Sequence, residues 1–283
     1  MRKHRVLDLF SGIGGFSLGL ERTGGFETVA FCEIEPFPRK VLAKHWPEVP
    51  IYDDVRTLTA ERLATDGIAV DVICGGFPCQ DISFAGKGAG LAGERSGLFY
   101  EVARLVGELE PRYVILENVS ALLSRGLADV LGTLASLGYD AEWHCIPASY
   151  LGAPHRRDRI WIVAYPSLLQ RNGSELYGKH GESQVSELGA GSGSVALANA
   201  DRTQRQRGGL PFGVYAEHAY ASGASWWGTE PNVGRVADGV PDRAHRLKGL
   251  GNAVVPQIPE LIGRAILDAL ARETRQEVTA SPA

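Results

Sequence analysis

A cysteine between a proline and a glutamine is the residue of this sequence best suited to covalent chemistry. Cys79 lies in the run GGFPCQDIS, residues 75–83. A thiol is intrinsically the best nucleophile among side chains, even near its free pKa of ~8.5. Pro78 fixes φ and can stiffen the segment, while Gly75 and Gly76 leave room for a bound molecule beside the sulfur. The alternative for a lone cysteine at a strand end is a small hydrophobe that packs in the core. We accept that alternative for the remaining cysteines, Cys32, Cys74 and Cys145.

Two further groups of polar residues adjoin strand-like runs. Glu117 comes directly after the apolar run Tyr113–Leu116, and we expect it at the same sheet edge as Cys79. A carboxyl group at that depth can stay protonated and donate a hydrogen bond to a ring nitrogen. The run PHRRDR, residues 154–159, precedes another strand-like run. Its arginines suit contacts to phosphates or to the carbonyl oxygen of a base.

A glycine-rich turn near the N-terminus has the pattern of a cofactor-binding loop. The run DLFSGIGG, residues 8–15, follows the first strand-like run and opens a helical pattern. Such glycines let the backbone approach a ligand closely, although the turn alone could be an ordinary tight turn. Glu33 stands 21 positions after Gly12, at the end of the second strand-like run, where a carboxylate can accept hydrogen bonds from ribose hydroxyls. Together they predict a cofactor of the adenosine type.

This spacing does not separate a nicotinamide cofactor from S-adenosylmethionine. The ring of Phe10, at the end of the first strand, could cover an adenine face. Asp54, in the run YDDV (residues 52–55), is expected to follow a strand that comes before the run at 70–74. Its carboxylate could accept a hydrogen bond from the adenine amino group. A solvated turn carboxylate is an equally good interpretation of Asp54.

The elements that must position these residues form a doubly wound α/β pattern. Apolar, β-branched runs alternate with helical patterns in the N-terminal half, as in a mostly parallel sheet covered on both faces. Open α/β sheets bind their ligands at the carboxyl ends of the strands, where the polar turns lie. The expected strands are 5–10, 28–32, 70–74, 113–116, 141–146 and 159–164.

The amino-acid composition changes in the second half of the chain. Residues 166–239 are rich in Gly, Ser, Asn and Gln, with few apolar runs, which predicts a small, loop-rich region. Residues 258–270 have apolar positions at helical spacing, so we expect a final amphipathic helix on the sheet, with a frayed tail from 272 to 283. We therefore divide the chain into a catalytic and cofactor-binding domain (1–165), a loop-rich region (166–240) and a return segment with the C-terminal helix (241–283).

Composition is that of a globular protein without a membrane segment. The 283 residues are 44% hydrophobic and 22% charged, with a formal net charge of -4, values that do not by themselves indicate nucleic-acid binding. The four cysteines include no C-x-x-C pair, which argues against zinc or a disulfide framework, and we expect no metal. The apolar stretch after the basic N-terminus breaks at Asp8, so we expect a cytoplasmic protein.

Five blocks of the sequence resemble, in the usual order, the signature blocks of the cytosine-5 DNA methyltransferase family. The resemblance implies a Rossmann-like fold, S-adenosylmethionine as methyl donor, and double-stranded DNA as substrate. The blocks are residues 8–15 (DLFSGIGG), 76–80 (GFPCQ), 117–119 (ENV), 157–159 (RDR) and 251–256 (GNAVVP).

The resemblance also implies a role for individual residues. Cys79 would add to C6 of a flipped-out cytosine, so that C5 attacks the methyl group and then loses its proton. Glu117 would contact the N3/N4 edge of the base and Arg159 its O2, with Arg157 supporting the pocket. Extruding the base from the duplex costs a few kcal/mol, which protein contacts must offset. The implied cofactor-binding residues are Phe10, Ser11, Gly12, Ile13, Gly15, Glu33, Ile34, Asp54, Val55, Gly76, Pro78, Leu98 and Asn252.

The sequence departs from the family pattern at two places. His155 stands where relatives often carry Gln, which puts the detail of that contact in doubt. The block that usually precedes the final Gly-Asn run is missing, and residues 238–248 stand in its place, which suggests an abbreviated hinge. Asn252, expected to approach the cofactor, is intact.

The resemblance implies that the loop-rich residues 166–240 are the variable, target-recognition region of the family. We expect DNA contacts there and in the segment after the nucleophile. Arginine and glutamine side chains in DRTQRQR, residues 201–207, can read guanine and adenine edges, or can form a solvated basic loop that touches only phosphate. The segment after Cys79 resembles a loop that closes over DNA. The candidate DNA-binding residues are Gln80, Ser83, Lys87, Arg95, Arg202, Arg205 and Arg207.

Two other functions remain as alternatives. A transfer-RNA methyltransferase family shares the Pro-Cys-Gln and Glu-Asn-Val blocks, but the substantial variable region favours duplex DNA. A DNA-binding module that holds the cofactor without turnover is disfavoured by the presence of Cys79, Glu117 and Arg159. We expect a monomer in a bacterial cell or encoded by a phage, with a companion restriction endonuclease as a candidate partner.

Overall fold

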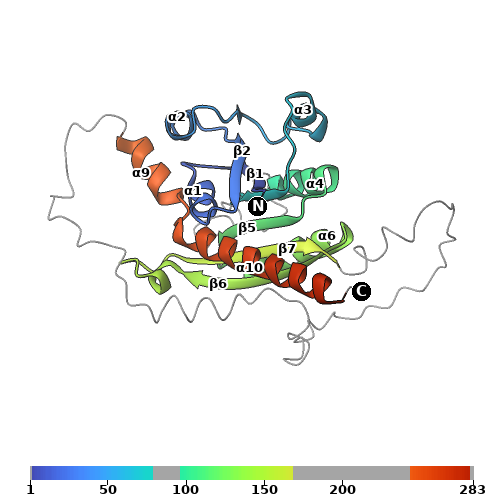
Figure 1. The fold of residues 1–283 in the computed structure, drawn as a ribbon. Helices are drawn as coiled ribbons and strands as arrows, with labels where there is room; N and C mark the ends of the chain where they lie inside the picture. The colour runs from blue at the N-terminus through green and yellow to red at the C-terminus, as the bar shows by residue number, and fades with distance from the viewer. Residues whose placement is uncertain (1, 79–95, 168–242, 281–283) are drawn as a thin grey trace, which may run out of the picture.

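The computed structural model describes residues 2–78, 96–167 and 243–280. Their strands form one seven-stranded sheet of order β3-β2-β1-β4-β5-β7-β6 (Figure 1). The first five strands in this order pair in parallel, and β7 runs antiparallel to both of its neighbours. The strands are β1 (His4–Leu9), β2 (Phe26–Cys32), β3 (Ile51–Tyr52), β4 (Val72–Gly75), β5 (Tyr113–Val119), β6 (Tyr139–Pro147) and β7 (Asp158–Pro166). The expected mostly parallel, Rossmann-like sheet is thereby confirmed.

Helices cover both faces of this sheet. On one face, α3 (Ala60–Thr65), α4 (Phe99–Leu109), α5 (Leu122–Arg125) and α6 (Leu127–Ser136) contribute to a core with Leu7, Leu9 and Ile73. On the other face, α1 (Gly15–Arg22) and α10 (Gln257–Ala280) pack over Val6, Val72 and Ile115 (Figure 1). The remaining elements are α2 (Pro36–His45), α9 (Arg243–Asn252) and the short 3-10 helices η2 (Ser96–Leu98) and η3 (Ala148–Leu151).

Helix α4 shows how the sequence directs this packing. Phe99, Val102, Ala103 and Val106 are all buried, and their spacing of three and four places them on one face of the helix. The opposite, more exposed face carries Glu101, Arg104 and Glu108. The helix ends at Leu109, before Glu110 in the left-handed conformation.

The return segment packs closely against α1. A Cβ added at Gly15 would lie 2.5 Å from the carbonyl oxygen of Val254, and one at Gly19 would meet the carbonyl oxygen of Pro256. Glycine at these two helical positions therefore permits backbone-to-backbone approach. Val255, Ile258 and Ile262 are buried beside them, so the expected docking of the final helix is confirmed.

Two expectations were wrong. The tail was expected to fray from Arg272, but α10 continues to Ala280, because residues 271–277 (ARETRQE) contain no glycine or proline and are mostly good helix formers. Cys145 was expected to be buried, but it is exposed on β6, which pairs with one neighbour and forms an edge of the sheet. Cys32 and Cys74 are buried as expected, and burial raises the pKa of Cys32 to about 12.

Most of the expected target-recognition region, residues 168–242, lies outside the described residues. Within the described residues, no helix has the length and apolar character needed to cross a membrane.

Candidate cofactor and catalytic site

The register of the parallel strands brings the candidate residues to one edge of the sheet. Leu9 of β1 pairs with Cys32 of β2 and with Gly75 of β4, and Gly75 pairs with Leu116 of β5. The residues that follow these positions therefore emerge side by side. They are the glycine-rich turn after β1, Glu33 and Ile34 after β2, Gly76 and Pro78 after β4, and Glu117 within β5.

The turn after β1 has an unusual backbone. Phe10, Gly12 and Gly14 all have positive φ, at 51°, 54° and 84°. Phe10 is not glycine, so its left-handed conformation stores strain of the kind that gathers at functional sites. The Ser11 hydroxyl donates a hydrogen bond to the Asp8 carbonyl oxygen at 2.5 Å, and a Cβ added at Gly12 would meet nothing within 4 Å. The hydrogen bond of Ser11 therefore holds the turn on the end of β1, while the space beside Gly12 is open.

Glu33 connects this turn to the end of β2. Its carboxylate accepts a hydrogen bond from the Gly12 N–H at 2.7 Å and another from the Glu35 N–H at 2.7 Å. The residue is only 8% exposed. Each carboxylate oxygen has a second lone pair, so Glu33 can order the turn and still accept hydrogen bonds from a ribose. Ile34, beside it, is 60% exposed.

Asp54 lies in the loop between β3 and α3. Arg56 holds its carboxylate with three side-chain hydrogen bonds of 2.7 to 3.1 Å, and donates a fourth from its own backbone N–H. The Arg56 side chain, with its backbone, lowers the pKa of Asp54, so the group is an acceptor. The neighbouring Val55 is buried at 4% exposure and anchors the loop in the core.

Glu117 and Arg159 form an ion pair at the catalytic edge. The Arg159 Nε lies 2.9 Å from the Glu117 Oε1, and the two side chains are 22% and 12% exposed. Strand pairing explains the contact, because Glu117 and Val119 of β5 face Trp161 and Arg159 of β7. Burial raises the pKa of Glu117, while Arg159 and Arg157 oppose that shift. The protonated state of this carboxyl group stays a prediction.

The segment that leads to Cys79 lies against this pair. A Cβ added at Gly76 would lie 3.0 Å from the Glu117 Oε2, so glycine there lets the backbone lie directly beside the carboxyl group. Asn118 donates a hydrogen bond from Nδ2 to the Phe77 carbonyl oxygen at 3.2 Å. Asn118 is buried and ties the end of β5 to residues 76–78.

The C-terminal segment is joined to the same edge. The Arg157 Nη1 donates a hydrogen bond to the Gly251 carbonyl oxygen at 2.7 Å, and Arg157 itself has a positive φ of 40°. Lys248 forms an ion pair with Glu35 at 2.8 Å. Both contacts lie within the four residues that precede Asn252, the predicted cofactor residue at the end of α9.

The structure thus brings together most of the predicted cofactor residues with Glu117, Arg157 and Arg159. Eight predicted residues lie outside the described residues, namely Cys79, Gln80, Ser83, Lys87, Arg95, Arg202, Arg205 and Arg207.

Several supporting residues were missed from the sequence. Arg56, Arg104 and Lys248 each hold a loop or segment of the site. The spacing of Glu101, Arg104 and Glu108 could have indicated ion pairs on a helix face. Their reach to another loop could not have been found that way, because it depends on how the helix packs.

The parallel sheet with its ligand edge places the chain in the Rossmann-like class. The model of the family described as C-5 cytosine-specific DNA methylase matches residues 4–197. That match covers more than half of the 283 residues, so the chain belongs to this family. The resemblance carried by the five sequence blocks is confirmed.

Individual relatives agree with this assignment. Type II methyltransferase M2.BsuMI of Bacillus subtilis is 35% identical over 168 residues, covering 56% of this chain and 41% of the relative. Type II methyltransferase M.Sau3AI of Staphylococcus aureus is 36% identical over 184 residues, covering 58% and 44%. The matched part of the chain thus spans less than half the length of these relatives.

Solved structures show the same fold. A protein described as a DNA modification methyltransferase encoded within an Escherichia coli prophage aligns with a TM-score of 0.51 and 30% identity, covering 59% of this chain and 48% of that one. A Spodoptera frugiperda DNMT2 structure aligns with a TM-score of 0.50 at 24% identity, covering 59% and 51%. The second likeness concerns the fold alone.

Proposed function

We propose that this protein is a DNA (cytosine-5-)-methyltransferase that moves a methyl group from S-adenosylmethionine to C5 of a flipped-out cytosine in a specific duplex sequence. The observation that carries the proposal is the partly buried Glu117–Arg159 pair, which lies against Gly76, three residues before Cys79. Family membership and the Type II names of the relatives support the reaction class. The Type II names and bacterial sources of the relatives favour a bacterial enzyme with a companion restriction endonuclease as a candidate partner. We further propose that it acts in the cytoplasm as a monomer.

The residues of the site fit S-adenosylmethionine. The turn at Gly12 is open to a ligand, Glu33 retains acceptor capacity for ribose hydroxyls, and Asp54 can accept a hydrogen bond from the adenine amino group. The bound cofactor supplies an electrophilic methyl group on a sulfonium. We assign its binding to Phe10, Ser11, Gly12, Ile13, Gly15, Glu33, Ile34, Asp54, Val55, Gly76, Pro78, Leu98 and Asn252.

The proposed reaction begins when the Cys79 thiolate forms a bond to C6 of the cytosine. A protonated Glu117 donates a hydrogen bond to N3, and Arg159 donates to O2, so that both stabilise negative charge as it develops on the ring. C5 would then take the methyl group, leaving the cofactor as the neutral thioether S-adenosylhomocysteine. A base would remove the C5 proton, and the electron pair of that bond would re-form the C5–C6 double bond and expel the Cys79 thiolate. Arg157 holds the return segment in place through Gly251.

Methyl transfer to defined nucleic acids tests the proposal directly. The purified chain is incubated with methyl-labelled S-adenosylmethionine and either mixed-sequence duplex DNA or transfer RNA. We expect label in DNA. Label in transfer RNA alone would favour the RNA alternative, and cofactor binding without transfer to either would favour the idle binding module.

A mechanism-based substrate tests the covalent step. Duplex DNA with 5-fluorocytosine at a proven target should trap the enzyme, because fluorine at C5 cannot leave as a proton does. We expect an adduct that survives denaturing electrophoresis and that maps to Cys79 by peptide mass. Cys79→Ser should form no adduct while still binding the cofactor.

A further inference from the structure

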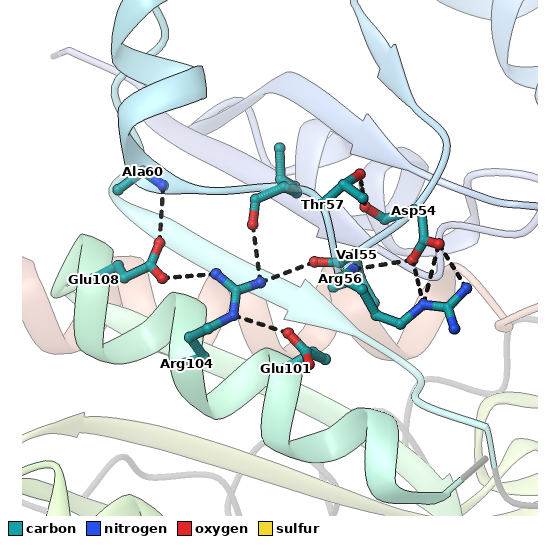
Figure 2. Close-up of polar contacts among 9 residues, drawn as sticks. Asp54, Val55, Arg56, Thr57, Ala60, Glu101, Arg104 and Glu108 are labelled. Atoms are coloured by element: carbon teal, nitrogen blue, oxygen red, sulfur yellow. Dashed lines mark hydrogen bonds and ion pairs between the residues drawn. The ribbon is translucent and has the colours of Figure 1, made fainter. Parts of the chain in front are cut away.

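Arg104 of α4 connects its helix to the loop that carries Asp54. We define residues 53–59, between β3 and α3, as the Asp54 loop. The Arg104 Nη2 donates hydrogen bonds to the carbonyl oxygens of Val55 at 3.0 Å and Leu58 at 2.9 Å (Figure 2). One guanidinium nitrogen therefore binds two backbone groups three residues apart in the same loop.

Two carboxylates orient this guanidinium from the helix side. The Arg104 Nε donates to Glu101 at 2.8 Å, and its Nη1 donates to Glu108 at 2.7 Å (Figure 2). Burial opposes the positive charge, but Glu108 and Glu101 outweigh it and raise the pKa of Arg104. The cation is therefore permanent, and its bonds to the loop are charge-assisted and stronger than neutral ones.

Glu108 adds a third contact from α4 to the same part of the chain. Its second oxygen accepts a hydrogen bond from the Ala60 N–H at 2.9 Å, at the start of α3. Burial alone would raise the pKa of Glu108, but this bond and Arg104 together lower it. Helix α4 thus binds two carbonyl groups and one N–H group over six consecutive residues, 55–60.

These contacts set the position of Asp54. Val55 and Leu58 are 4% and 1% exposed, and their carbonyl groups take their hydrogen bonds from α4. Asp54 directly precedes Val55, and its own carbonyl oxygen accepts from Thr57 within the loop. Without the guanidinium, the peptide groups after Val55 and Leu58 lose their partner and can rotate, which moves the Asp54 carboxylate.

We propose that Arg104 is a positioning residue for the adenosine end of the S-adenosylmethionine site, acting through the carbonyl groups of Val55 and Leu58. The inference rests on the proposed function, because it assigns the Asp54 loop to the cofactor. Arg104 does not touch the cofactor. It fixes the loop before the cofactor arrives, so that binding does not have to order the loop.

The first experiment measures cofactor affinity by titration calorimetry on the full chain without DNA. Arg104→Gln should weaken binding of S-adenosylmethionine by about 10- to 100-fold, the loss expected for one or two charge-assisted hydrogen bonds. Arg104→Lys should recover part of the affinity. Steady-state methylation should show the loss in KM for the cofactor, with kcat changed less than about threefold at saturation.

Two matched controls separate the loop contacts from helix ion pairs in general. Glu101→Gln removes a charge partner of Arg104 but leaves its bonds to the loop, and should change affinity by less than about threefold. Arg264→Gln removes an ion pair of the same kind on α10, where Arg264 and Glu260 lie 2.7 Å apart. It should leave cofactor binding unchanged.

A double-mutant cycle with Asp54→Asn tests the route of the effect. If Arg104 acts through Asp54, the two losses of cofactor affinity are not additive. Arg104→Gln then lowers the affinity of the Asp54→Asn protein much less than it lowers the affinity of the wild type. Additive losses, or an unchanged affinity in Arg104→Gln, would overturn the inference. If Arg104→Gln does not fold, the same cycle is run with Arg104→Lys.

Failure of the inference can be distinguished from failure of the proposed function. A wild-type chain that binds no S-adenosylmethionine contradicts the proposed function. A wild-type chain that binds it, with Arg104 variants that bind equally well, contradicts the role of Arg104 alone.

Discussion

Two effects act in opposite directions on the protonation of Glu117 in the Glu117–Arg159 pair. Burial favours a neutral Glu117, whereas Arg159 at 2.9 Å favours the carboxylate. A base that accepts one hydrogen bond at O2 and another at N3 would separate these effects, because Arg159 could bind O2 while Glu117 keeps its proton for N3. The pair is therefore suited to a substrate that has both groups on one edge.

Glu117→Gln should lower the rate of methyl transfer by about 10²- to 10³-fold, the usual loss for one group that stabilises developing charge. The amide keeps the shape of the carboxyl group but cannot supply the same acidic donor. Single-turnover measurement with saturating cofactor checks this, with cofactor affinity measured in parallel. Glu142→Gln, at a carboxylate that accepts from the Tyr165 hydroxyl on the β6–β7 edge, is the matched control and should keep full activity. A normal rate in Glu117→Gln would remove Glu117 from the mechanism.

Asp8 should make the stability of the fold dependent on pH. Burial, opposed by the Ser17 hydroxyl, raises the pKa of Asp8 to about 7, and its Oδ1 has no hydrogen-bond partner in the part of the chain that the structure describes. The unfolded pKa is ~3.9, so the stabilising contribution of the neutral form is present below that value and is lost as the pH rises to about 7. Relative to Asp8→Asn, which stays neutral, the wild-type unfolding free energy should fall by about 4 kcal/mol over this range.

Urea denaturation of both proteins at several values between about pH 4 and about pH 8 measures this difference. The two unfolding free energies should diverge as the pH rises to about 7 and should differ by a constant amount above it. Parallel curves would mean that Asp8 is ionised in the folded protein throughout.

At the scale of elements, the site depends on one close helix contact. Helix α1 begins at the cofactor turn, and its Gly15 and Gly19 lie against the backbone of the segment that follows Asn252. The N-terminal helix and the return segment are therefore in close backbone contact beside the candidate cofactor site.

Gly19→Ala should destabilise the protein by about 1–3 kcal/mol, because the new methyl group meets the Pro256 carbonyl oxygen and overpacks a tight contact. Thermal unfolding measures the loss of stability. Cofactor titration measures the loss of affinity expected if Asn252 is displaced at the same time. Gly132→Ala is the matched control, since Gly132 lies within helix α6 and a Cβ there meets nothing within 4 Å. That change should be neutral or stabilise by up to about 1 kcal/mol. Equal effects of the two substitutions would contradict the packing argument.

At the scale of the molecule, local sequence signals determined the sheet and the order of the site blocks. The buried strands were predictable because each is a continuous apolar run bounded by a polar turn, and Glu33 was placed by its spacing from Gly12. The strand at 159–164 was predicted, but its antiparallel placement between β5 and β6 was not, because pairing between distant strands leaves no local pattern. The role of Arg104 could not be predicted for the same reason, because its partners Val55 and Leu58 lie more than forty positions away in the sequence.

The separate contributions to the candidate site should respond together when the cofactor binds. The glycine turn, Glu33, the Asp54 loop and the segment around Asn252 come from distant parts of the chain but converge on one sheet edge. Ligand binding to the folded state suppresses local opening wherever it makes contact. We therefore expect S-adenosylmethionine to slow amide hydrogen exchange in residues 10–15, 33–35, 53–59 and 250–254. Strand β6 forms the far edge of the sheet, so its exchange should not change. Protection confined to residues 10–15 would mean that the other segments do not belong to the cofactor site, and equal protection of β6 would indicate general stabilisation in place of a local site.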